Sequence, residues 1–93
     1  MKTLSSGEIA ERLAKAPGWH LQGKEITKPF RFPSFKAALV FVNKVGDIAE
    51  AADHHPDITI NYNRVTLVLT THAAGGLTER DFALAAEIET VAP

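Results

Sequence analysis

The stretch Ile58-Thr-Ile-Asn-Tyr-Asn-Arg-Val-Thr-Leu-Val-Leu-Thr-Thr71 decides the fold. Its first half alternates apolar and polar side chains, and its second half is rich in β-branched residues. Both patterns favour β-strands. Asn63 and Arg64 lie between the halves, where a two-residue turn would join them. The stretch therefore predicts an antiparallel hairpin with its turn at Asn63 and Arg64.

The segment before this hairpin has the pattern of a long helix. Pro33-Ser34 provides a stop and an N-cap, and apolar residues at helical spacing follow as far as His54. Pro56 disfavours helical geometry at His55, so the helix should end at about Asp53 to His55. The apolar stripe that we expect to face the core consists of Phe35, Leu39, Val42, Val45 or Gly46, and Ala49.

The same helix carries a second apolar face, formed by Phe41, Val45, Ile48 and Ala52. A helix that is apolar on two faces usually has two things to pack against. A chain of 93 residues has room for one core, and neighbouring subunits often stabilise so small a domain. We therefore expect a homodimer or homotetramer that uses this second face.

A loop and a further helix follow the hairpin. Gly75-Gly76 opens the loop, and Thr78 with Asp81 forms a capping-box pattern, which predicts a helix that continues through Ile88 to Val91. The paired glycines could expose backbone amides to an electron-rich ligand, but such pairs more often just permit a turn.

Two more elements precede the long helix. Ser5 and Glu8 form a capping box, which predicts a helix that Pro17-Gly18 ends. The segment from Trp19 to Phe32 changes to even apolar spacing around a glycine, which predicts another hairpin. The order is thus α-ββ-α-ββ-α. This order predicts a single α+β domain over residues 1–93, with a four-stranded antiparallel sheet covered on one face by helices.

Composition excludes several classes of protein. Ten Lys and Arg face eleven Asp and Glu without any basic block, so direct nucleic-acid binding is not expected. The longest aliphatic and aromatic run, Ala37 to Val42, is far shorter than the roughly 20 residues that cross a bilayer. The N-terminus carries charges where a signal peptide needs apolar residues. We expect no membrane association and a cytoplasmic location.

Three of the four histidines are the first candidates for chemistry. His54 and His55 are adjacent at a predicted helix end, and His72 follows the hairpin. Glu50 lies one turn before His54, so its carboxylate could meet that imidazole on one helix face. Carboxylates and the negative helix end stabilise the imidazolium, which suits a proton donor. The alternative is an exposed ion pair and histidines that merely suit a helix C-terminus.

Other interpretations of these residues stay open. His54, His55 and His72 could hold zinc, but adjacent helical side chains diverge by about 100°, which makes this the weaker hypothesis. Asp81 is explained by its capping position alone, or it contributes to a site.

The residues that carry a family resemblance are four segments: Glu50-Ala-Ala-Asp-His-His-Pro-Asp57, Asn61-Tyr-Asn-Arg-Val65, Thr71-His-Ala-Ala-Gly-Gly-Leu-Thr78 and Asp81. Together they closely resemble the pterin-4a-carbinolamine dehydratases. Gly18-Trp19 and the aromatic residues from Phe30 to Phe41 also match, so the resemblance covers nearly the whole chain in register. The four segments together are specific to this family, although any one of them alone would be weak evidence for it.

This resemblance implies an enzyme of tetrahydrobiopterin recycling that dehydrates 4a-hydroxytetrahydrobiopterin to quinonoid dihydrobiopterin, without a metal or other cofactor. It implies that His54, His55 and His72 occupy the catalytic positions. The positions that it places beside the pterin are Glu50, Pro56, Thr71, Ala73, Ala74 and Asp81. The alternative is a non-catalytic oligomeric binding module or dimerisation cofactor, a role that some animal relatives also have.

The division of labour among the histidines can be predicted more finely. We expect His54 to be the acid, His72 its partner acid or base, and His55 mainly a pterin contact. Two departures from the family bear on substrate fit and rate: many animal members carry an aromatic residue where Ile58 stands, and a cysteine where Ala74 stands.

Overall fold

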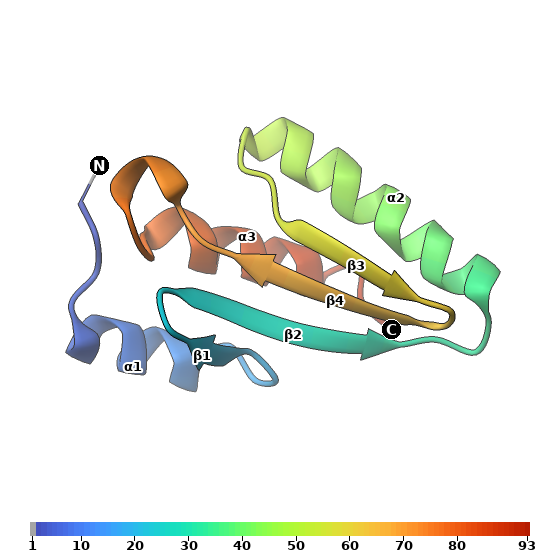
Figure 1. Cartoon of the computed structure of the whole chain (residues 1–93), viewed down its shortest axis with the longest axis horizontal. Coiled ribbons are helices and arrows are strands. Elements are labelled where there is room, and N and C mark those ends of the chain that lie inside the picture. The colour runs from blue at the N-terminus through green and yellow to red at the C-terminus, as the bar shows by residue number, and fades with distance from the viewer. Residues whose placement is uncertain (1) are drawn as a thin grey trace.

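A computed structural model describes residues 2–93 of the chain. Helix α1 (Ser6–Ala14) is followed by strands β1 (His20–Gln22) and β2 (Glu25–Arg31) and by helix α2 (Phe35–Ala52). Strands β3 (Asp57–Asn61) and β4 (Arg64–Leu69), the 3₁₀ turn η1 (His72–Ala74) and helix α3 (Glu79–Glu89) complete the chain (Figure 1). The predicted order α-ββ-α-ββ-α is confirmed.

The four strands form one antiparallel sheet in the order β1-β2-β4-β3. In the central pair, Ile26 lies opposite Leu69 and Phe30 opposite Val65, so the apolar side chains of both strands share one face. All four are buried, while the residues that alternate with them are more exposed. The fold is therefore the predicted two-layer α+β architecture, with helices on the apolar face of the sheet.

The helix starts agree with the capping patterns of the sequence. In α1, the Ser5 hydroxyl accepts from the Glu8 N–H, and the Glu8 carboxylate accepts from the Ser5 N–H. The hydrogen bonds from the Ser5 backbone and side chain lower the pKa of Glu8 below its ordinary value. At α3, Thr78 and Asp81 form the equivalent reciprocal pair. Both capping boxes are thus confirmed.

The face of α2 that enters the core differs from the expected one. Its buried residues are Ala38, Phe41, Val45 and Ala49. The Phe41 ring lies 4.8 Å from the Phe30 ring between centroids, in the middle of the core. The predicted stripe was correct at Val45 and Ala49 but wrong at its first residue, since Phe35 is 47% exposed. Short alanine side chains at both ends of the buried stripe let the helix approach the sheet, and they contribute little to an apolar pattern.

The same observation corrects the expected subunit interface. Phe41 and Val45 are 2% and 0% exposed within one chain, and Ile48 and Ala52 pack against the same core. The face formed by these four residues is consequently the interior of the subunit and cannot be free for a second copy.

The turn of the second hairpin lies one residue earlier than predicted. Asn61 pairs with Arg64, so the two turn residues are Tyr62 and Asn63. The Asn63 side chain donates to the Phe32 carbonyl at 2.9 Å, and the Phe32 N–H donates to the Asn63 carbonyl at 2.8 Å. These contacts to the end of β2 hold Asn63 in the turn. Tyr62 then takes a positive φ of 54°.

Candidate active site

Helix α2 ends in a residue that turns the chain away from the helix axis. Asp53 adopts left-handed backbone angles, φ 49° and ψ 43°. The following N–H, that of His54, donates to the Ala49 carbonyl at 3.1 Å, as in the usual helix-terminating motifs. His54 and His55 therefore lie beyond the helix, and a shared helical face cannot bring Glu50 to His54.

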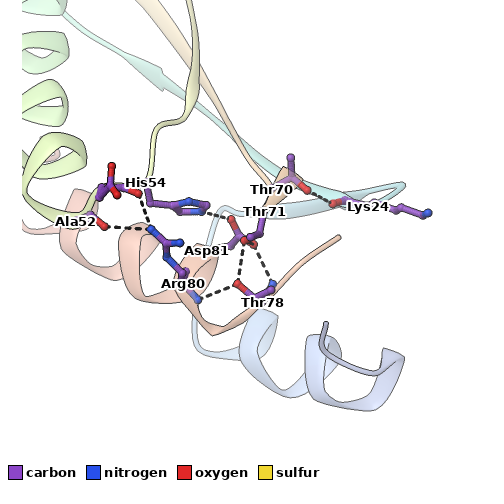
Figure 2. Close-up of polar contacts among 9 residues, drawn as sticks. Lys24, Ala52, His54, Thr70, Thr71, Thr78, Arg80 and Asp81 are labelled. Atoms are coloured by element: carbon purple, nitrogen blue, oxygen red, sulfur yellow. Dashed lines mark hydrogen bonds and ion pairs between the residues drawn. The ribbon is translucent and has the colours of Figure 1, made fainter. Parts of the chain in front are cut away.

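His54 is held by a buried carboxylate on another helix. Its Nε2 lies 2.6 Å from Oδ1 of Asp81, the third residue of α3. His54 is 8% exposed and Asp81 is 0% exposed, so water screens this contact little. Figure 2 shows the His54 ring pointing at Asp81 across the space between the end of α2 and the start of α3. The chain thus builds a histidine–aspartate pair from residues 27 positions apart.

The second oxygen of Asp81 is also fully engaged. Oδ2 accepts from the Thr71 hydroxyl at 2.8 Å and from the Thr78 N–H at 2.9 Å (Figure 2). The hydroxyls of Thr71 and Thr78 lie 2.9 Å apart, which links the end of the hairpin to the cap of α3. A carboxylate that accepts from this many donors is fixed in position. Asp81 serves as capping residue and as His54 partner together, so its capping role alone does not account for it.

Glu50 pairs with the other histidine of the motif. Its Oε1 lies 2.6 Å from Nε2 of His55, and both side chains are exposed, 79% and 56% respectively. The expected contact between Glu50 and His54 is therefore wrong, because the left-handed turn at Asp53 reverses the positions of the two imidazoles relative to the helix. An exposed pair of this kind contributes about 0.2–1 kcal/mol.

A cavity of about 230 Å³ brings the three histidines together. His54 and His55 enter it from the segment after α2, and His72 enters it from η1. His72 is exposed. The other lining residues are Asp53, Thr70, Thr71, Ala73 and Arg80. Two separate segments thus place three groups that titrate near neutral pH around one small space.

The remaining residues of the predicted site lie around this cavity and not on its wall. Asp81 stands behind His54 and reaches no solvent. Pro56 and Ala74 are half-buried next to lining residues. Glu50 is tied to the cavity only through His55. The lining residues can therefore contact a ligand directly, whereas Asp81 and Glu50 can act on it only through His54 and His55.

Arg80 is a lining residue that sequence reasoning missed. Its guanidinium donates to the Asp53 carbonyl at 2.5 Å and to the Ala52 carbonyl at 3.3 Å, at the end of α2 (Figure 2). A cation in the first turn of a helix opposes that helix's own dipole. This position was the available signal, since a cation there is stabilised by acceptors from another element, and here the acceptors are the carbonyls at the end of α2.

Thr70 connects the cavity to the first hairpin. Its hydroxyl donates to the Lys24 carbonyl at 2.7 Å, as Figure 2 shows, so the β1–β2 turn is anchored beside the three histidines. Within residues 2–93 no three His, Asp or Glu side chains converge closely enough to hold a metal ion. Over the same residues, no helix is long and apolar enough to cross a membrane.

Comparison with protein families matches residues 2–91 to the model of the family described as "Pterin 4 alpha carbinolamine dehydratase". Among similar proteins, one from Chloroflexus aurantiacus is 59% identical over 91 residues, which is 98% of each chain. One from Sulfurisphaera tokodaii is 51% identical over 89 residues, 96% of each chain. Both bear the name "Putative pterin-4-alpha-carbinolamine dehydratase".

Two solved structures resemble the fold. A transcriptional coactivator/pterin dehydratase from Brucella melitensis superposes with a TM-score of 0.94 and 35% identity, over 99% of this chain and 100% of that one. A pterin dehydratase-like protein identified as a RuBisCO assembly factor in the alpha-carboxysome gives a TM-score of 0.68 and 26% identity, over 80% and 88%.

Proposed function

Since the chain belongs to the pterin-4a-carbinolamine dehydratase family, we propose that it dehydrates 4a-hydroxytetrahydrobiopterin to quinonoid dihydrobiopterin and water. The cavity lined by His54, His55 and His72 is the proposed active site. The single observation that carries this proposal is the buried pair of His54 and Asp81 at the edge of that cavity.

The reaction needs two proton transfers and no change of oxidation state. The C4a hydroxyl leaves as water after it receives a proton, while the lone pair of N5 forms the C=N bond and N5 loses its proton. One proton is delivered and one is taken up, so the total number of protons on the enzyme is unchanged, and the donor and the acceptor regain their starting states by proton exchange with solvent. Two imidazoles can perform both transfers.

Asp81 determines which nitrogen of His54 takes part. In our proposal Asp81 is an ionised carboxylate, which can only accept, so His54 Nε2 carries a proton toward Oδ1. Nδ1 is consequently the nitrogen that gains and loses the exchangeable proton. A carboxylate that fixes the tautomer and orientation of a catalytic imidazole has this role in many acid–base sites. In our proposal His54 donates from Nδ1 to the departing hydroxyl.

His72 is the proposed partner that takes the N5 proton. It comes from η1, on a different segment from His54, and it is exposed to solvent, with which it can exchange the proton. His55 has the proposed role of holding the pterin, since Glu50 fixes its ring at 2.6 Å. Thr71 and Ala73 also line the cavity, and we propose that they contact the pterin.

The second candidate function is that of a binding or assembly module. The observation in its favour is the likeness to a pterin dehydratase-like protein identified as a RuBisCO assembly factor. The buried His54–Asp81 pair supports catalysis in our proposal, because a buried ionic pair adds little net stability, and the α3 cap needs only the other oxygen of Asp81.

We also propose that the protein is a homodimer or homotetramer in the cytoplasm. Strand β3 is at the edge of the sheet, and all five of its residues are exposed. Ile58 and Ile60 on this strand are 37% and 38% exposed, and Phe35 and Val40 on α2 are 47% and 51% exposed. Subunit association commonly buries exposed edge strands and large exposed apolar side chains of this kind.

The test of function is a rate measurement on purified protein with 4a-hydroxytetrahydropterin generated in the assay. Acceleration over the spontaneous dehydration supports the enzyme, and its absence favours the binding module. Elemental analysis of untagged protein separates metal-free catalysis from a zinc enzyme: stoichiometric zinc that leaves together with activity would contradict the metal-free proposal.

A further inference from the structure

Two further cavities lie next to the histidine cavity, along the turn of the first hairpin. The nearer one, of about 390 Å³, shares Thr70 and His72 with the histidine cavity. The farther one, of about 270 Å³, shares four lining residues with the nearer one, namely Gly23, Lys24, Gly75 and Gly76. We call these two cavities together the hairpin groove. The three cavities therefore follow one another in a row that begins at the histidines.

Hydrogen bonds hold both ends of this groove in place. The Thr70 hydroxyl donates to the Lys24 carbonyl at 2.7 Å, which fixes the β1–β2 turn against the end of β4. The Leu4 N–H donates to the Leu77 carbonyl at 2.9 Å, which fixes the segment before α1 beside the loop before α3. The groove is thus formed before any ligand arrives, as most ligand sites are.

Glycines keep the middle of the groove open. Gly23 and Gly75 have positive φ values, 62° and 77°, which most side chains disfavour. A Cβ added at either position would meet no heavy atom within 4 Å beyond its chain neighbours. The backbone therefore faces open space at both positions, and a side chain there would extend into that space.

The lining of the groove changes from polar to apolar with distance from the histidines. The nearer cavity, beside His72, is lined by polar residues and glycines only. Lys24 is the single charged residue that lines the farther cavity within residues 2–93, and Figure 2 shows its side chain extending away from His54. The apolar side chains of the farther cavity are those of Leu4, Ile9 and Leu77.

The proposed chemistry determines which part of the substrate faces the groove. N5 of a pterin is bonded to both C4a and C6, so C6 lies next to the atom that His72 deprotonates in our proposal. His72 lines both the histidine cavity and the nearer cavity of the groove. A substituent on C6 therefore leaves the histidine cavity past His72. The histidine cavity alone, at about 230 Å³, is smaller than the range of about 300–1,000 Å³ that is usual for small-molecule sites.

We propose that the hairpin groove binds the C6 substituent of the pterin and selects substrates in which this substituent is long. Its first segment is polar and lies in the nearer cavity. An aromatic ring and a carboxylate beyond it lie in the farther cavity, where apolar side chains and Lys24 suit them. Folate-type pterins have this chemistry. The inference rests on the proposed function and adds a substrate class to it, with Gly23 and Gly75 as the residues that determine specificity.

Calorimetry with three ligands of one oxidation state measures what the groove contributes to binding. The C6 substituent of 6-methyl-7,8-dihydropterin is too short to enter the groove, and that of 7,8-dihydrobiopterin is short and hydroxylated. The substituent of 7,8-dihydrofolate carries an aromatic ring and carboxylates. We expect dihydrofolate to bind at least about tenfold more tightly than 6-methyl-dihydropterin, with dihydrobiopterin between them.

Substitutions of the two glycines narrow the groove from opposite sides. Gly75→Asn and Gly23→Asn each add a side chain to one wall, and Asn tolerates positive φ better than most residues. Each variant should reduce the preference for dihydrofolate over 6-methyl-dihydropterin to about threefold or less. Because this preference is a ratio of two affinities, a variant that weakens binding of the pterin ring itself leaves it unchanged. Gly23→Asn tests the groove even if Gly75→Asn does not fold.

Gly46→Asn is the control for these variants. It adds the same side chain on α2, where a Cβ also meets no atom within 4 Å and where no residue lines the groove. It should keep the preference of the wild type.

The dehydration rate of the 6-methyl substrate separates this inference from the proposed function. Acceleration by the wild type together with equal affinities for the three ligands would retain the dehydratase and overturn the inference. A preference for dihydrofolate that the glycine variants lose, without any acceleration, would retain the groove and overturn the proposed function. The inference also fails if none of the three ligands binds, or if both glycine variants keep the preference of the wild type.

Discussion

Replacing Asp81 by Asn probes the step on which the proposed chemistry depends. The carboxylate accepts from three donors: His54 Nε2 at 2.6 Å, the Thr71 hydroxyl at 2.8 Å and the Thr78 N–H at 2.9 Å. Asn has one acceptor oxygen, and its amide nitrogen can only donate. If the oxygen keeps the contacts of the α3 cap, the NH₂ group faces His54 Nε2. The ring then turns or changes tautomer, and Nδ1 no longer presents the exchangeable proton.

The expected effects on rate and stability are of different sizes. Loss of a positioned acid or base costs about 10² to 10⁴ in rate, so we expect kcat to fall about 10²-fold or more, equivalent to about 3 kcal/mol. A buried donor left without its acceptor costs about 1–3 kcal/mol. For a domain of this size, about 2 kcal/mol lowers Tm by roughly 8–16 °C.

The assay compares kcat and KM by absorbance with Tm by circular dichroism. Glu79→Gln is the matched control, since it removes a charge from the same first turn of α3 but its carboxylate contacts Arg12 and is exposed. It should leave kcat within about twofold. A folded Asp81→Asn protein with the kcat of the wild type would refute the role of the pair in orienting His54.

Three further predictions concern the catalytic histidines, the core residue Val45 and the helix cap at Glu8. His72→Ala should lower kcat about 10²-fold with little change in Tm, while His55→Ala should mainly raise KM; steady-state kinetics with equal kcat for both would contradict these roles. Val45→Glu should abolish cooperative thermal unfolding, because Val45 is 0% exposed and the change buries a carboxylate in the core. Val40→Glu, at a 51% exposed position, should still unfold cooperatively. Similar thermal melts of the two variants would contradict the assignment of Val45 to the core. The hydrogen bond from the N-cap backbone N–H lowers the pKa of Glu8, so its contribution to stability is complete above the ordinary value of 4.5 and is lost as pH falls through the lowered value. Glu8→Gln should therefore lose less stability than the wild type over that acid range in thermal melts, and an identical loss would contradict this linkage.

The order of elements could be predicted because each boundary has a local chemical cause. Ser5 and Thr78 cap their helices through side chains three residues ahead in the sequence, so the helix starts depend on little else. The hairpin turn was misplaced by one residue because its position depends on a distant contact, that of Asn63 with Phe32. Local propensity carries no information on such a contact.

The three predicted histidines line one cavity, but the carboxylate partners of His54 and His55 were not predicted. Glu50 was expected beside His54 on a continuing helix, and the left-handed conformation of Asp53 sends His54 to Asp81 instead. Spacing could explain Asp81 fully as a capping residue, which concealed its second contact. The core face of α2 was predicted only in part for a similar reason, because a short side chain such as that of Ala38 contributes little to an apolar pattern. Tertiary packing determines both the partner of His54 and the core face of α2, and neither can be predicted from local sequence patterns alone.

The central claim is that this chain is a dehydratase whose acid–base group is His54 oriented by Asp81. The most direct measurement is the dehydration rate of purified wild-type protein beside that of Asp81→Asn, under saturating 4a-hydroxytetrahydropterin. We predict clear acceleration by the wild type and a kcat lower by about 10²-fold in the folded variant. A wild-type rate equal to the spontaneous one would contradict the claim, and so would a variant as fast as the wild type.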